Sequence, residues 1–128
     1  MSYHFSKTIS LPFDEAIETV TAALMERGFG VLSTIDVKAT LKSKIDVDFR
    51  PYTILGACNP NFAYQALQSE NKIGVMLPCN VIVQQTDDGR VEVSAVDPVA
   101  SMQAIENAAL GGIAQEVQGL LKETIDAL

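Results

Sequence analysis

Apolar and polar residues alternate at the start of the chain, and the pattern then changes to a helical one. Tyr3 to Leu11 carries apolar residues at period two with serine and threonine between them, which predicts a half-buried strand. Pro12 ends this strand. From Phe13 to Leu24 the apolar residues fall on one face of a helix, and Gly28 suits the left-handed conformation that commonly ends helices.

The next segment predicts two strands with an ambiguous stretch between them. Strand-forming residues are frequent in two stretches, Val31 to Ile35 and Phe49 to Ala57. Asp36 to Ile45 is ambiguous, because Asp36 can cap a short helix whereas the threonine and serine that follow disfavour one. Asn59 followed by Pro60 is typical of a helix start, with a capping side chain and then proline in the first helical position. This short helix extends to Leu67.

The last third of the chain predicts a hairpin and a long helix. Ile73 to Thr86 is strand-forming but is interrupted by Pro78. The turn at Asp87-Asp88-Gly89 leads into the alternating segment from Val91 to Ala95, which completes a hairpin. Ser101 can cap a final helix that reaches Leu128.

Gly111 and Gly112 are expected to kink or divide that final helix. Because no repeat or linker interrupts the 128 residues, we expect one domain. The order of elements predicts an α+β fold with an antiparallel or mixed sheet and helices packed on one face.

Composition and charge exclude several classes of partner. Nine basic residues against sixteen acidic ones give a net charge of −7, which opposes binding to the phosphates of nucleic acid. We interpret the basic cluster of Lys38, Lys42, Lys44 and Arg50 as a solvated surface. The sequence has no signal-peptide pattern and no apolar run long enough to span a bilayer. We therefore expect a soluble cytoplasmic protein that binds neither nucleic acid nor membrane.

Both cysteines precede an asparagine, in the segments Ala57-Cys58-Asn59-Pro60 and Pro78-Cys79-Asn80-Val81. If Asn59 caps a helix, Cys58 lies just outside its positive end, where a thiolate is favoured and the thiol pKa falls. Cys79 lies beside a proline in an irregular strand, and such irregularities often occur next to functional sites. Cys58 and Cys79 are therefore the candidate catalytic residues.

Two other interpretations of the cysteines remain open at this stage. Free cysteines are often buried and inert, and the two could instead form a disulfide or redox pair, which geometry alone decides. A metal site is not expected, because two cysteines and His4 do not supply the four ligands of a closed zinc site. We expect His4 to be exposed in the first strand, and a Cys-His nucleophile pair would have to use it.

Three segments together resemble the family called domain of unknown function 302 over nearly the whole chain. They are Glu26-Arg27-Gly28-Phe29-Gly30-Val31, Ile54-Leu55-Gly56-Ala57-Cys58-Asn59-Pro60 and Leu77-Pro78-Cys79-Asn80-Val81. The resemblance implies a β-α-β4-α domain, with Ile73 to Gln85 as one interrupted strand, and homodimers in bacterial or archaeal cytoplasm. It supplies no activity and no cofactor.

We therefore predict a module that binds a small molecule or an anion where the two Cys-Asn segments meet. Its predicted site comprises Cys58, Asn59, Pro60, Pro78, Cys79 and Asn80. Two alternatives stay open. One is a thiol-dependent enzyme or redox protein that uses Cys58, with Cys79 as the resolving thiol. The other is a dimeric structural or interaction protein in which the cysteines belong to the core.

Overall fold

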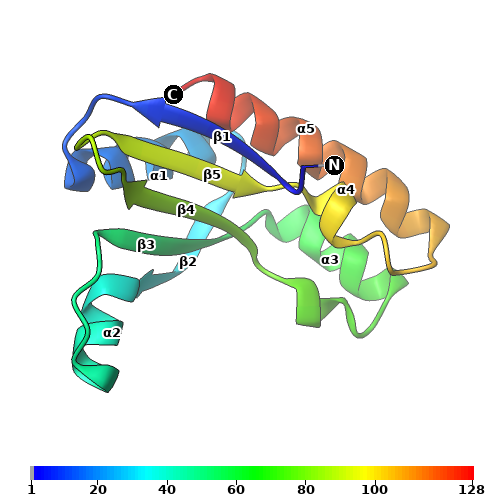
Figure 1. The fold of residues 1–128 in the computed structure, drawn as a ribbon. Helices are drawn as coiled ribbons and strands as arrows, with labels where there is room; N and C mark the ends of the chain where they lie inside the picture. Colours follow the sequence, from blue (N-terminus) through cyan, green and yellow to red (C-terminus); the bar gives the residue numbers. More distant parts are fainter. Residues whose placement is uncertain (1) are drawn as a thin grey trace.

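The fold is built on one five-stranded antiparallel sheet, seen here in a computed structural model that describes residues 2–128. The strands lie in the spatial order β1-β5-β4-β3-β2 (Figure 1). They are β1 (His4–Ile9), β2 (Gly30–Asp36), β3 (Tyr52–Cys58), β4 (Cys79–Gln85) and β5 (Val91–Val96). Every neighbouring pair is antiparallel, so the predicted α+β class with an antiparallel sheet is confirmed.

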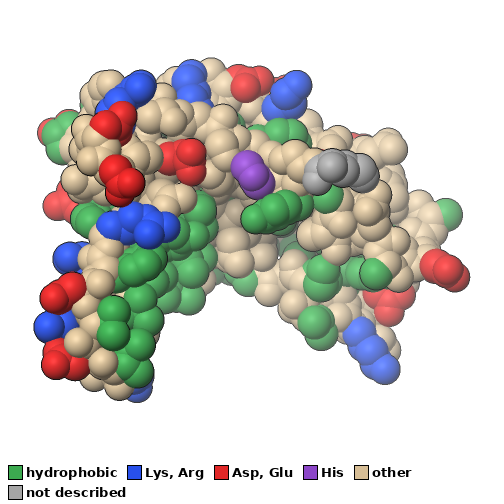
Figure 2. Space-filling model, viewed as in Figure 1, with side chains coloured by type: hydrophobic (Ala, Val, Ile, Leu, Met, Phe, Trp, Pro, Cys, Tyr) green, Lys and Arg blue, Asp and Glu red, His purple; other side chains and the backbone are tan. Residues whose placement is uncertain are grey.

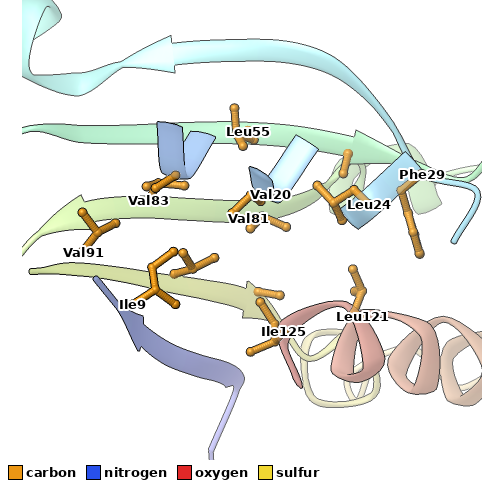
Figure 3. Packing of buried hydrophobic residues seen from close by; sticks show 14 of the residues in the cluster. Ile9, Val20, Leu24, Phe29, Leu55, Val81, Val83, Val91, Leu121 and Ile125 are labelled. Atoms are coloured by element: carbon orange, nitrogen blue, oxygen red, sulfur yellow. The ribbon is translucent and has the colours of Figure 1, made fainter. Parts of the chain in front are cut away.

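Two long helices pack against one face of this sheet. They are α1 (Phe13–Glu26) and α5 (Ala108–Asp126). Alternate residues of the central strands point toward them, because successive side chains of a strand face opposite ways. The resulting core includes Val20 and Leu24 from α1, Leu121 and Ile125 from α5, and Val81 from β4 (Figure 3). Removing this apolar surface from water is the main force that holds the helices on the sheet.

The local capping signals act where the sequence predicts them. The Asn59 side chain accepts a hydrogen bond from the Phe62 backbone N–H at the start of α3 (Pro60–Ser69). Asp36 caps α2 (Val37–Ile45) in the same way, accepting from the Ala39 N–H at 2.9 Å. The ambiguous segment is thus a helix, since its cap outweighs the weak helix propensity behind it.

Helix α2 stands apart from the rest of the molecule. It projects away from the sheet beside β2 and β3 (Figure 1), and none of its nine residues is buried. The sheet face opposite α1 and α5 carries no helix packed over its centre in the part of the chain that the structure describes. This uncovered surface is called the open face below.

Two predicted elements are corrected. Ile73 to Met76 forms a 3₁₀ turn, η1 (Ile73–Met76), and only Cys79–Gln85 is strand, because Ile73 is buried in a small separate cluster and Pro78 has no N–H for a ladder. Ser101 does not cap the last helix. It is the last residue of the short helix α4 (Pro98–Ser101), which Asp97 caps.

The last helix is continuous through its glycine pair. Asn107 caps α5 by accepting a hydrogen bond from the Ala109 N–H at 3.1 Å. Gly111 and Gly112 lie inside this helix, so the division falls at residues 102–107 instead of at the glycines. A glycine inside a helix costs only about 1 kcal/mol, which is not enough to interrupt the helix here. The cap therefore determines where the helix begins.

Candidate functional site

A small cavity lies at one end of the sheet, between the sheet and the helices α3, α4 and α5. Its volume is about 40 Å³, and with its open mouth the hollow measures about 410 Å³. Its lining includes Cys58, Asn59, Cys79 and Met102. The other lining residues are apolar: Phe29, Phe62, Ala63, Ala66, Leu77, Pro98, Ile113, Ala114 and Val117. This cavity is called the thiol cavity below.

The topology of the sheet explains why two cysteines distant in sequence share this cavity. Cys58 is the last residue of β3 and Cys79 is the first of β4. Because the strands are antiparallel, these two ends meet at the same end of the sheet. Ala57 pairs directly with Cys79, so Cys58 and Cys79 lie one register position apart in neighbouring strands, and both line the cavity. Both are half-buried free thiols.

The environment of Cys79 opposes its ionisation. Burial raises the pKa of the Cys79 thiol to about 11, and the neighbouring Cys58 adds a smaller contribution in the same direction. Burial has this effect because a charged thiolate loses its hydration in an apolar environment. Cys79 is therefore a neutral thiol near pH 7 when the cavity is empty.

Asn59 joins the thiol cavity to the end of α1. Its side chain caps α3, and its amide nitrogen lies 2.9 Å from the position that a Cβ atom would take on Gly28. Gly28 has a φ of +86°, the left-handed cap that the sequence predicts. A glycine at this position therefore leaves room for the amide that orders the rim of the cavity.

The structure brings together only part of the predicted site. Cys58, Asn59 and Cys79 line the thiol cavity, whereas Pro60 is an exposed residue in the first turn of α3. Asn80 pairs with Gly56 and lines two surface hollows other than the thiol cavity. Pro78 Cγ lies 2.8 Å from the Cβ position of Gly56, next to Ser33. Pro78 and Asn80 therefore do not line the cavity.

Some residues of the cavity carry no signal in the sequence. Met102 belongs to the loop after α4, and Ala63 is one of several alanines in α3. Only the tertiary arrangement places them beside the cysteines. The position of Asn80 did have a signal, because strand alternation puts the residue after Cys79 on the opposite face.

The open face carries a second, wider hollow of about 480 Å³. His4 lines it, and its Nδ1 atom lies 2.8 Å from the Ser6 hydroxyl, which in turn lies 2.7 Å from the Ser94 hydroxyl. His4 is exposed, as the sequence predicts. Because the cysteines line the other cavity, the described residues form no Cys-His pair.

Metal ligands of the usual kind do not gather at either hollow. Within residues 2–128, no cluster contains three or more histidine, cysteine, aspartate or glutamate side chains placed to hold an ion. The thiol cavity is lined by two thiols and one thioether, with no carboxylate or imidazole.

Comparison with known proteins adds a family. The model of the family DUF302, described as a domain of unknown function, matches residues 5–128. The chain belongs to the DUF302 family. A solved structure of an uncharacterised conserved DUF302 protein from Bacillus stearothermophilus is 30% identical, with a TM-score of 0.91 over 98% of each chain. No curated protein matches the chain.

The family membership confirms the resemblance found in the sequence and the β-α-β4-α order of the main elements. It adds no activity. Among residues 2–128, no helix combines the length and the apolar character needed to cross a membrane.

Proposed function

We propose that this DUF302 protein is a binding module that takes a small ligand without negative charge into the thiol cavity. The observation that carries the proposal is the convergence of Cys58, Asn59 and Cys79 on one otherwise apolar cavity. Free thiols in a cavity offer a ligand polarisable contacts that a purely hydrocarbon core does not.

The size of the cavity limits the ligand. An apolar cavity of about 150 Å³ accommodates benzene, whereas the thiol cavity measures about 40 Å³. The enclosed part therefore fits a group of one to a few atoms, and any larger remainder of a ligand would lie in the open mouth.

The charge of the lining favours a neutral or cationic ligand over an anion. No lysine, arginine or histidine is among the lining residues, and an unpaired anion in an apolar site loses its hydration without compensation. An anion is therefore the less favoured ligand of this cavity. A thiol-dependent reaction is less well supported than binding, because the raised pKa of Cys79 keeps the expected resolving thiol protonated near neutral pH.

Xenon is a suitable probe, because it enters small dry cavities without needing a polar partner. Methyl NMR spectra of the reduced protein under xenon pressure should show saturable shifts for Ala63, Ala66 and Ala114. Ala63→Leu, which places a larger side chain in the cavity, should abolish these shifts. Ala39→Leu is the matched control, because Ala39 is an exposed helical alanine in α2.

A further control separates the two hollows. Asn80→Ala removes a side chain from the open face and should leave the xenon shifts unchanged. Absence of saturable shifts in the unmodified protein would overturn the proposal. Equal shifts in the unmodified protein and in Ala63→Leu would overturn it as well.

We also propose that the chain forms a homodimer through the open face and α2. Large apolar side chains are exposed on this part of the molecule, with Ile35, Ile45 and Val47 at 47%, 63% and 42% exposure. Figure 2 shows hydrophobic side chains gathered where the projecting helix α2 meets the sheet. A nine-residue helix without buried residues is marginal in water by itself, so a partner that covers α2 would stabilise it.

A second copy fits this surface because the chain offers both complementary parts. Each copy has a projecting helix α2 and a hollow of about 480 Å³ on the open face, so the α2 helix of each copy can pack against the other copy in one symmetric interface. One lysine of α2 has its charge paired locally, since Lys42 lies 3.0 Å from Asp46 and 3.2 Å from Asp48.

Sedimentation over a range of concentrations tests the homodimer. Ile45→Glu should raise the dimer dissociation constant by more than about tenfold, because it places a charge in an apolar contact. Met25→Glu is the control, because Met25 is 69% exposed on α1, which covers the other face. A monomer at every accessible concentration would contradict the proposal, as would equal weakening by both variants.

A further inference from the structure

We infer that the thiol cavity binds a monovalent soft metal ion, Cu(I) or its analogue Ag(I), through the sulfur atoms of Cys58, Cys79 and Met102. The inference rests on the proposed function, since it names the ligand of the same cavity. Its basis is the chemistry of the lining. All three sulfur-bearing side chains line this one cavity, and each comes from a different segment of the chain.

Three separate segments hold these side chains in place. Cys58 and Cys79 are anchored by the β3–β4 ladder at the paired position Ala57–Cys79. Met102 follows α4, whose start is fixed by the Asp97 cap, and Gln118 of α5 donates to the same carboxylate at 3.0 Å. Met102 and Cys79 also share the lining of a neighbouring surface hollow.

The donor set selects the metal. Thiolate and thioether ligands favour Cu(I), whereas carboxylate, carbonyl and water favour magnesium, calcium and manganese. Zinc takes four ligands in a closed site, and the cavity offers two thiols with no carboxylate or imidazole among its lining residues. A zinc ion would therefore remain short of ligands in this cavity.

Binding exchanges protons for the ion. Both thiols lose their protons as the sulfur–metal bonds form, so one Cu(I) ion releases two protons and leaves the complex with one net negative charge. No electron is transferred, because the copper stays Cu(I). The start of α3 lies next to Cys58, and the partial positive charge of a helix N-terminus offsets that negative charge.

The pH dependence of binding follows from this exchange. Because the thiol protons leave as the ion binds, the affinity should rise with pH.

The test is an anaerobic titration of the reduced full chain with Cu(I) against a chromogenic Cu(I) chelator, with Ag(I) adducts counted by native mass spectrometry. The expected result is one ion per chain. Cys58→Ser and Cys79→Ser should each weaken binding by more than about 100-fold, since even residues outside the ligand set are worth 10- to 100-fold. Zinc should not displace the ion.

Two methionine variants test the metal site even if a serine variant fails to fold. Met102→Leu should weaken Cu(I) binding by about tenfold, because it removes one soft donor and keeps the apolar volume. Met76→Leu is the control, since Met76 lines the neighbouring hollow and not the thiol cavity. Equal affinities of Met102→Leu and Met76→Leu would remove Met102 from the ligand set and overturn the three-sulfur site.

The xenon experiment separates this inference from the proposed function. If xenon enters the cavity and Cu(I) binding is absent or equally shared by zinc, the metal inference fails and the binding module stands. If neither xenon nor Cu(I) enters, both fail.

Discussion

Cys79 lies directly opposite Ala57 in the β3–β4 ladder, one register position from Cys58, and both cysteines line the same cavity. The two cysteines are twenty-one positions apart in the sequence, with a helix and a 3₁₀ turn between them. The antiparallel ladder brings them to one end of the sheet, and α3, α4 and α5 close the cavity around them. Ligand binding in the thiol cavity depends on this relationship.

The raised pKa of Cys79 predicts a pH-dependent loss of stability. Between the ordinary value of 9.0 and the folded value of about 11, the unfolded chain loses the Cys79 proton while the folded chain keeps it. The free energy of unfolding therefore falls as the pH rises through this window, by roughly 2 to 3 kcal/mol in total. Below pH 9 the contribution is constant.

Chemical denaturation at pH 8 and pH 11 measures this loss, and Cys79→Ala isolates it from the lysines and tyrosines that titrate in the same range. The variant should lose about 2 kcal/mol less than the unmodified protein over this interval. Identical losses in the two proteins would show that Cys79 is not held in its protonated form.

Gly56 should not tolerate a side chain. A Cβ atom there would lie 2.2 Å from Ser33 Oγ and 2.8 Å from Pro78 Cγ. We expect Gly56→Ala to lower the free energy of unfolding by about 1 to 3 kcal/mol, the usual cost of overpacking. Gly119→Ala is the matched control, because its Cβ would meet no atom within 4 Å and alanine stabilises a helix by up to about 1 kcal/mol over glycine.

Thermal unfolding of the two variants provides the comparison. The melting temperature should fall for Gly56→Ala and rise for Gly119→Ala. A Gly56→Ala variant as stable as the unmodified protein would mean that Ser33 and Pro78 move away freely.

We expect Asn59 to contribute to stability mainly as the cap of α3. Asn59→Ala removes the cap of α3 and should cost about 1 kcal/mol. It should also speed amide hydrogen exchange in the first turn of α3. Asn61→Ala is the control, because Asn61 is an exposed residue of the same turn without a capping role. Equal effects of the two substitutions would argue against the cap.

Local signals predicted the elements that depend on neighbouring residues. The caps at Asp36 and Asn59 and the left-handed Gly28 act within a few residues of their own position, so the sequence alone reveals them. The start of α5 was missed because Ser101 and Asn107 are both suitable caps, and only packing decides between them.

The candidate site was predictable only in part for the same reason. The repeated Cys-Asn pair indicated two segments of interest, and the antiparallel topology explains why Cys58, Asn59 and Cys79 line one cavity. Asn80 was grouped with them by sequence proximity, although strand alternation turns it to the open face. Met102 reaches the cavity through tertiary packing alone, which no local pattern reports.

The most direct test of the central claim is a crystal structure of the reduced protein determined under xenon pressure. The account predicts one xenon atom between Cys58, Cys79 and Ala63, and no xenon at that position in crystals of Ala63→Leu. A cavity that stays empty in the unmodified protein, or xenon bound only on the open face, would contradict it.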